Sequence, residues 1–263
     1  MKILTWNCRG IGNPWTVNAL RDRCWREMPD IVFLMETMID AKKLERVRSK
    51  CGFVHGVCLN SDGRSGGMGL WWRDIAMKVC SFSSHHIEAE VWGEDNIPKW
   101  RAIGIYGWAE TEEKHRTWEL MTTLKTRCSL PTVMFRDFNE ILGMHEKEGG
   151  VVRRERLIDA FREVIDSCAL RDLGYKGCIF TWQHGNTVNT LIRERLDRYL
   201  ADEDWVYLFP HNEVLHFPIY RSDHAPILLK CGTENVRKKG KKLFRFESMW
   251  LSSEECGRVV SSA

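Results

Sequence analysis

The sequence predicts an α/β protein in which β-sheets pack together and helices lie outside them. Short apolar, β-branched runs bounded by Gly, Pro, Asp or Asn recur along the 263 residues, which is the pattern of strands. Amphipathic helical segments lie between some of these runs, without strict alternation. Twelve Trp and eleven Phe residues favour a well-packed globule with a sizeable core. Stacked layers of sheet and helix accommodate this combination.

Eight runs are expected to form strands. In chain order they are "KILTWN" (2–7), "IVFLM" (31–35), "MGLWW" (68–72), "IEAEVW" (87–92), "RAIGIY" (101–106), "TVMF" (132–135), "CIFTW" (178–182) and "PILLK" (226–230). Helix starts are indicated at Asn13-Pro14, Asp40 and Thr111. The residues expected to face the core in these helices, and in a fourth, are Val17, Leu20, Cys24 and Met28; Leu44 and Val47; Leu120, Met121, Leu124 and Cys128; and Leu157, Phe161, Val164, Ile165 and Cys168.

One change of composition divides the chain. Residues 1–232 are expected to form one domain, and residues 233–263, which include "RKKGKK" (237–242), a basic linker and a truncated C-terminal extension. The ten cysteines form no CxxC pair, and Met1 opens a strand-like run without a signal peptide, which favours the nucleus or cytoplasm over secretion. No apolar stretch approaches the roughly 20 residues of a membrane span. The net charge of +3 does not by itself require a nucleic-acid partner.

Polar residues follow directly after several predicted strands. In "VMFRDFNEIL" (133–142), strand periodicity places Asp137 and Asn139 on one face and Arg136 on the other. A carboxylate and an amide side by side at a strand end can hold a water and a phosphate oxygen together. An Asx turn that ends the strand explains the same pattern and is the more common cause of it.

Asn7 and Glu36 repeat this arrangement, in "TWNCRG" (5–10) and "FLMET" (33–37). A carboxylate that follows an apolar run is costly to bury unpaired. A divalent cation would neutralise Glu36, because Mg²⁺ prefers one or two carboxylates with waters and phosphate. For this residue alone, a buried salt bridge explains the pattern equally well.

The segment "RSDHAP" (221–226) places Asp223 and His224 before another strand, and "RLDRYL" (195–200) supplies the carboxylate of Asp197. A His beside a carboxylate is held cationic and can serve a phosphate, although an ordinary surface turn also explains the run. Strand ends that converge at one edge would pool these acids, amides and the imidazole. The pooled set lacks a nucleophilic Ser or Cys with a base, and it suits metal-assisted attack of water on a phosphate ester.

These motifs occur in the order and spacing of a known family. "TWNCRG", "FLMET", "IYG", "DFNEIL", "FTW", "RLDRYL" and "SDHAP" together resemble the endonuclease/exonuclease/phosphatase superfamily. The chain is most similar to the endonuclease domain of LINE-type non-LTR retrotransposons, especially those of plants. "EKEGG", "DLGYKGCIFTW" and "FRFESMW" add to that likeness, which covers roughly residues 1–250.

The resemblance implies a four-layered αββα sandwich, with two mixed β-sheets face to face, helices outside and an active site at one rim. It also implies a phosphodiesterase that depends on Mg²⁺, with Mn²⁺ as a substitute. The resemblance also implies roles for the site residues. Glu36 would bind the metal, with Asn7 and Asp223 nearby, and Asp137 would activate the attacking water. Asn139, Tyr106 and Thr181 would support the water or the phosphate, and His224, oriented by Asp197, would stabilise the transition state.

Arg136 departs from the family pattern, which has glycine at this position. A glycine within a strand often marks a close backbone approach. A long charged side chain there must reach solvent or find a partner, or the strand must shift. A shift of about 1 Å at Asp137 would cost on the order of a hundredfold in rate. We therefore expect impaired, but not necessarily abolished, catalysis.

The activity implied by the resemblance is nicking of duplex DNA to leave a 3′-hydroxyl. The protein is expected to be a monomer that would be fused to a reverse transcriptase in a full-length element. A catalytically impaired nucleic-acid-binding remnant is one alternative, which Arg136 favours. A phosphatase or an RNA nuclease of the same superfamily is another, because the core residues do not separate these chemistries.

Overall fold

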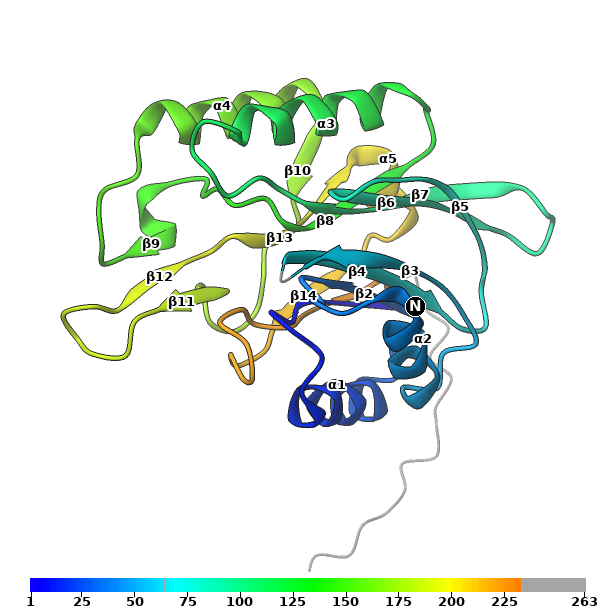
Figure 1. The fold of residues 1–263 in the computed structure, drawn as a ribbon. Coiled ribbons are helices and arrows are strands. Elements are labelled where there is room, and N and C mark those ends of the chain that lie inside the picture. The colour runs from blue at the N-terminus through cyan, green and yellow to red at the C-terminus, as the bar shows by residue number, and fades with distance from the viewer. Residues whose placement is uncertain (64, 233–263) are drawn as a thin grey trace, which may run out of the picture.

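The computed structural model describes residues 1–63 and 65–232, which form a four-layered sandwich (Figure 1). Two mixed sheets, each of six strands, lie face to face in the middle, and helices cover both outer faces. The fold class predicted from the sequence is therefore confirmed. The linker and extension expected over 233–263 lie outside the described residues. Among the helices in the described part of the chain, none combines the length and hydropathy needed to cross a membrane.

The first sheet has the strand order β14-β15-β1-β2-β4-β3 and the second the order β10-β13-β8-β7-β6-β5. The strands of the first sheet are β1 (Lys2–Asn7), β2 (Ile31–Met35), β3 (His55–Asp62), β4 (Ser65–Trp72), β14 (Glu213–His216) and β15 (Ile227–Lys230). Those of the second are β5 (Ala76–Phe82), β6 (His86–Trp92), β7 (Pro98–Tyr106), β8 (Thr132–Asp137), β10 (Leu170–Asp172) and β13 (Asp197–Asp202).

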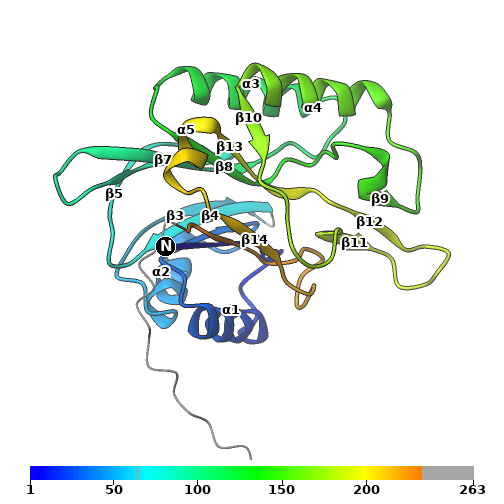
Figure 2. The ribbon, with the colours of Figure 1, turned by 180° about the vertical axis from the view of Figure 1, so that it is seen from behind.

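The helices and a small third sheet complete the fold. The helices are α1 (Pro14–Glu27), α2 (Ala41–Lys50), α3 (Lys114–Thr126), α4 (Glu155–Ser167), α5 (Glu203–Leu208) and a 3₁₀ turn at Met144–Glu146. The third sheet pairs β11 (Trp182–His184), β12 (Ile192–Glu194) and β9 (Lys147–Glu148). Seen from behind, the β11–β12 hairpin extends beyond the two large sheets at one end (Figure 2).

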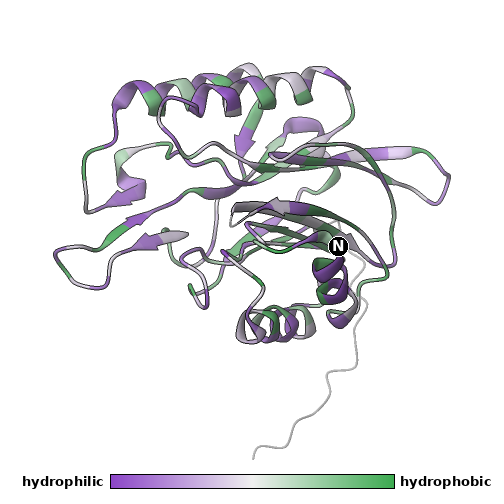
Figure 3. Ribbon diagram, viewed as in Figure 1, coloured by the Kyte–Doolittle hydropathy of each residue, from purple (hydrophilic) through white to green (hydrophobic). Residues whose placement is uncertain are grey.

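Apolar side chains fill the three spaces between the four layers. Phe33 and Phe135 meet edge to face between the sheets, with ring centroids 5.6 Å apart. A second cluster lies between the first sheet and α1 and α2, and a third lies between the second sheet and α3 and α4. Both helix layers carry polar and apolar residues in alternation, as one-sided burial requires (Figure 3). Burial of these apolar surfaces is what fixes the layers against one another.

The expected helix starts are confirmed at two of three positions. The side chains of Asn13 and Asp40 accept hydrogen bonds from the first turns of α1 and α2. The start predicted at Thr111 is wrong, because α3 begins at Lys114 without a side-chain cap. Met28 was also expected to face the core, but it ends α1 in a left-handed conformation and is 57% exposed.

Most of the run "CIFTW" is not a strand, since β11 begins only at Trp182. Six of the other predicted runs fall within strands, and the seventh, "PILLK", does so except for Pro226. The parallel pairs β1–β2 and β7–β8 end at the same edge of the sandwich. The antiparallel strand β13 starts at this edge, and β15 starts close to it. Residues at or just after the ends of the first four strands, and at or before the starts of the other two, are therefore brought together.

Candidate active site

A cleft of about 300 Å³ opens at this edge. Six of the nine candidate residues line it, and they are Glu36, Tyr106, Asp137, Asn139, Asp223 and His224. Asn7 and Asp197 are fully buried beneath the cleft and reach its wall through hydrogen bonds. Thr181 is placed differently, as described below. The convergence predicted from the strand ends is thus present in the structure.

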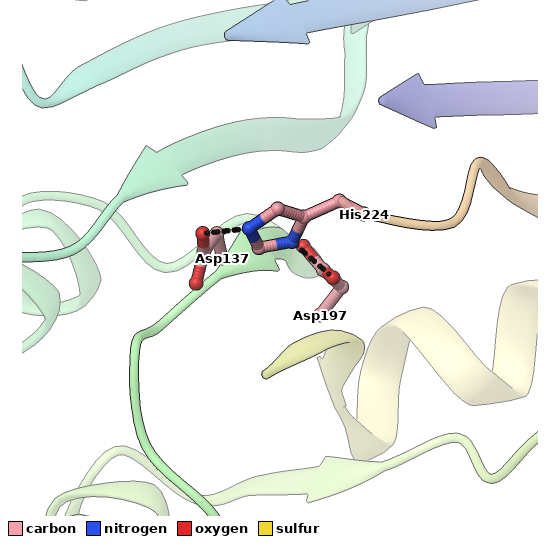
Figure 4. Close-up of side chains that lie close together, drawn as sticks. All are labelled: Asp137, Asp197 and His224. Carbon is pink, nitrogen blue, oxygen red and sulfur yellow. Dashed lines mark hydrogen bonds and ion pairs between the residues drawn. The ribbon is translucent and has the colours of Figure 1, made fainter. Parts of the chain in front are cut away.

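His224 lies between two carboxylates (Figure 4). Its Nδ1 is hydrogen-bonded to Oδ2 of Asp197 at 2.8 Å, and its Nε2 lies 3.6 Å from Oδ2 of Asp137. Burial lowers the pKa of His224, but the charges of Asp197 and Asp137 outweigh it, so that the pKa lies above its ordinary value. Burial raises the pKa of Asp137 to about 6. The imidazole is therefore favoured as a cation, held by Asp197 and directed at Asp137.

Glu36 is joined to the same cluster by neutral donors. The Asn7 amide donates from Nδ2 to Glu36 Oε1 at 3.0 Å and to Asp137 Oδ2 at 3.3 Å. The Tyr106 hydroxyl donates to Glu36 Oε1 at 2.9 Å. Burial, followed by the nearby charges of Glu36 and Asp137, raises the pKa of Tyr106, so that the phenol keeps its proton. No Lys or Arg within the described residues pairs with Glu36, which removes the salt-bridge explanation for this carboxylate.

Asp137 and Asn139 fit both explanations that the sequence allows. The Asn139 N–H donates to Asp137 Oδ1 at 2.9 Å, which is an Asx turn at the end of β8. The Asn139 side chain donates from Nδ2 to the Gly107 carbonyl at 2.7 Å. These bonds leave Asp137 Oδ2 facing Asn7 and His224. The turn therefore fixes the carboxylate in the cleft and does not exclude a chemical role.

Asp223 also lines the cleft, where other residues already hold its carboxylate. Arg9 forms an ion pair with Asp223 Oδ2, and Trp182 donates from Nε1 to the same oxygen at 3.0 Å. Ser222 donates its hydroxyl to the Asn7 carbonyl at 2.7 Å, which ties this loop to the end of β1. Asp223 is thus close to the other acids but already partly neutralised.

Thr181 does not line the cleft. It is fully buried, and its hydroxyl accepts hydrogen bonds from the backbone N–H groups of Leu196 and Asp197, both at 3.0 Å. Its contact is with the start of β13, so it supports Asp197 and is not in contact with the cleft.

The predicted direction of Arg136 is wrong. The side chain was expected on the face of β8 opposite to Asp137, but its Nη1 lies 3.4 Å from the Thr5 carbonyl and 3.5 Å from the Ala225 carbonyl, both across the space between the sheets. Its Nη2 lies 3.1 Å from Asp197 Oδ1. The backbone φ of 114° rotates the side chain out of the alternating pattern. Asp197 therefore has a cation on one oxygen and the imidazole of His224 on the other.

Several residues at this edge have strained backbones. Positive φ values occur at the non-glycine residues Arg9 (40°), Glu36 (48°), Arg136 (114°), Asn139 (55°) and Arg221 (62°). Such conformations cost about 1–3 kcal/mol each and gather at functional sites. Their concentration here supports this edge as the site.

Two cations in the cleft have no recognisable signal in the sequence. Lys114 is buried and pairs with Glu140 at 2.8 Å, and Arg153 lies 3.2 Å from the same carboxylate. Arg153 also pairs with Glu194, and all of these except Glu140 line the cleft. They come from the start of α3, the segment before α4, and β12.

Two other places in the described chain are less suited to a hard cation. Ligand atoms of Asp137, Asp197 and His224 lie within 4.8 Å of one another, so that this group can hold a metal ion. However, Arg136 already neutralises Asp197. A larger hollow of about 430 Å³ lies between α1 and α2, but its described lining has no carboxylate or imidazole. The oxygen-rich part of the cleft around Glu36 is the better position for a hard cation.

No family model matches the chain, and no curated protein matches it. Solved structures do match. An AP endonuclease from Leishmania major has a TM-score of 0.66 and 14% identity, covering 87% of this chain and 86% of that one. The endonuclease domain of TRAS1, a telomere-specific non-LTR retrotransposon, has a TM-score of 0.65 and 10% identity, covering 89% of this chain and 99% of that one. The 3′ phosphatase NExo from Neisseria, bound to a product DNA hairpin, has a TM-score of 0.65 and 17% identity, covering 89% of this chain and 100% of that one. At these identities the likeness establishes a shared fold.

Proposed function

Because the chain has the fold of the endonuclease/exonuclease/phosphatase superfamily, we propose that it is a divalent-metal-dependent endonuclease that nicks DNA as a monomer. The observation that carries this proposal is the meeting of Glu36, Asn7, Asp137 and His224 in one cleft. Asn7 joins the carboxylates of Glu36 and Asp137, and His224 faces Asp137. Acids for a cation, a base for water and a cation for the developing charge are the parts that phosphodiester hydrolysis needs.

Glu36 is the best metal ligand among these residues. Its carboxylate lacks a cationic partner in the described chain, is only half-buried and lines the cleft. Asn7 is hydrogen-bonded to it, and Asp223, which lines the same cleft, would exchange its pairing with Arg9 for the metal. Mg²⁺, with Mn²⁺ as a substitute, would act as a Lewis acid on the phosphate and the leaving oxygen.

Asp137 is suited to accept a proton from the attacking water. Its pKa of about 6 is close to neutrality, where a general base is most effective. Asn139 and Asn7 fix its two oxygens through hydrogen bonds of 2.9 and 3.3 Å. The carboxylate therefore has a defined orientation before substrate binds.

His224 is suited to stabilise negative charge on the phosphate. Asp197 holds its Nδ1, so that the Nε2–H points toward Asp137 and the cleft. Tyr106, whose hydroxyl donates to Glu36, would turn the same donor toward a phosphate oxygen. Donors set in place before the reaction typically contribute about 10²–10³ in rate.

The test is nicking of supercoiled plasmid by the native chain, by Glu36→Gln and by Glu94→Gln. Glu94 is an exposed carboxylate in the turn between β6 and β7, and it serves as the matched control. We expect nicking with Mg²⁺ by the native chain and by Glu94→Gln, none with EDTA, and none by Glu36→Gln. The product should be extended by a DNA polymerase, which requires a 3′-hydroxyl. Metal-independent nicking, or full activity in Glu36→Gln, would exclude this mechanism.

Arg136 supports a second candidate, a nucleic-acid-binding protein with impaired catalysis. The guanidinium occupies an oxygen of Asp197, the residue that orients His224. Binding of DNA without nicking in the same assay would favour this candidate. Release of phosphate from a 3′-phosphorylated end, or cleavage of RNA only, would instead identify the phosphatase or RNA nuclease alternatives.

A further inference from the structure

An exposed stack of aromatic and cationic side chains lies on the start of α1 and on the loop that precedes the cleft residue Asp223. The guanidinium carbon of Arg221 is 5.4 Å from the ring centroid of Trp15 and 4.9 Å from that of Tyr220. Trp15 is 63% exposed and Tyr220 is 57% exposed. Two large rings are thus left in water next to a cation, an arrangement that packing of the core does not explain.

The stack joins the start of α1 to the loop that leads to the cleft residue Asp223. Trp15 is in the first turn of α1, and its N–H donates to Asn13 Oδ1 at 2.9 Å. Arg221 directly precedes Ser222, whose hydroxyl is bonded to the carbonyl of Asn7. Asp223, in the cleft, is two residues from Arg221. The loop that carries Tyr220 and Arg221 is therefore anchored to the end of β1 at Asn7, and it enters the cleft two residues after Arg221.

We propose that Trp15, Tyr220 and Arg221 form a stacking platform for an unpaired base of the nucleic-acid substrate, so that the protein favours strands with unpaired nucleotides near the cleaved phosphate. This deepens the proposed function and rests on it. Flat aromatic faces accept any base, and a neighbouring arginine adds a cation–π contribution and attraction for phosphate. The bases of an uninterrupted duplex are already stacked on one another and gain nothing from the platform.

Two arginines between the stack and the cleft residue Asp223 suit an anionic chain such as nucleic acid. Arg9 is 52% exposed and lies on the cleft side, where it pairs with Asp223. Together with Arg221 it gives a positive border on which a phosphate chain can continue from the platform to the cleft. An acidic peptide would meet the same charges, so it enters the test as a competitor.

The test measures binding without cleavage, in the Glu36→Gln background with Mg²⁺ and a fluorescent oligonucleotide. Trp15→Ala is compared with Trp25→Ala, which removes a 74% exposed Trp near the other end of the same helix. We expect Trp15→Ala to weaken binding of a single strand by about fivefold to a hundredfold and to leave blunt-duplex binding unchanged. Trp25→Ala should change neither, and Trp15→Phe should retain most of the affinity.

Tyr220→Ala provides a second variant if Trp15→Ala fails to fold in a thermal unfolding control. Equal losses for single strand and duplex, unaltered single-strand binding, or displacement of the oligonucleotide by polyglutamate through the same residues would each overturn the platform. Absence of nicking by the native chain, with a Trp15-dependent loss of single-strand binding, would refute the proposed endonuclease and leave the platform standing. Nicking by the native chain, with unaltered single-strand binding in Trp15→Ala, would refute the platform and leave the proposed endonuclease standing.

Discussion

Replacement of Arg136 by glycine and, separately, by alanine distinguishes two effects of this side chain. Both replacements remove the guanidinium from Asp197. The φ of 114° is accessible to glycine but costly for alanine, so only glycine also relieves the backbone. The difference between the two variants therefore measures strain, and the change that they share measures the loss of the ion pair.

The strain should be worth about 1–3 kcal/mol, of which the greater unfolded-state entropy of glycine offsets about 0.5–1 kcal/mol. At 3.1 Å the pair has a gross Coulomb energy of about 5 kcal/mol at an effective dielectric of about 20, and most of that is spent on desolvation. Breaking one partner of a buried pair costs about 3–5 kcal/mol. We therefore expect Arg136→Ala to be the least stable of the three chains and Arg136→Gly to lie between it and the native chain.

Urea unfolding gives the stabilities by linear extrapolation, and plasmid nicking with enzyme in excess gives the rates. In both variants Asp197 loses its ion pair with residue 136 and keeps its hydrogen bond to His224. If the strained backbone also displaces Asp137, only glycine should speed nicking, by up to about a hundredfold. Equal stability of the glycine and alanine variants would refute the strain, and unchanged nicking by a well-folded Arg136→Gly would refute the attenuating role.

Three further predictions follow from single contacts. Burial lowers the pKa of His216 to about 4, so the unfolded chain binds a proton at higher pH than the folded chain does. The free energy of unfolding should therefore fall by about 3 kcal/mol as the pH drops from about 6.5 to 4. In His216→Gln, urea titrations should show a smaller difference in the free energy of unfolding between pH 7 and 4.5. Asp197→Asn should lower the nicking rate by about a hundredfold or more with little change in KM, because His224 loses the group that orients it; a native rate would contradict this. In Gly104→Ala the added Cβ would lie 2.4 Å from the Phe33 ring, so we expect about 1–3 kcal/mol of destabilisation, partly recovered by Phe33→Leu in thermal unfolding; simple additivity of the two changes would count against the clash.

The sequence predicted the edge at which the candidate residues meet, because the relevant signals are local. Asn7, Glu36 and Asp137 each interrupt an apolar run at the end of a strand, and neighbouring parallel strands must end at the same edge. The resemblance to known nucleases then supplied Tyr106 and the orientation of His224 by Asp197. The other hydrogen bonds inside the site were not predicted, because partners such as Asn7 and Glu36 are 29 residues apart.

Two features of the site were not predicted correctly, because each depends on the folded chain and not on the local pattern of residues. Arg136 was assigned to the wrong face because the alternation of side chains assumes ordinary strand dihedrals, and nothing in the amino-acid pattern announces a positive φ. Lys114 and Arg153 were missed because a helix start and a loop bring them to the cleft only after the chain has folded. Burial of charge depends on tertiary partners, which a periodicity cannot supply.

The face-to-face sheets have one more consequence. Asn7 and Glu36 belong to one sheet edge, and Tyr106 and Asp137 belong to the other, with Phe33 and Phe135 packed between the sheets. Neither sheet alone carries the complete set of candidate groups. Loss of the apolar packing between the two sheets would separate those groups without altering any of them. The proposed activity should therefore be lost as soon as the two sheets come apart.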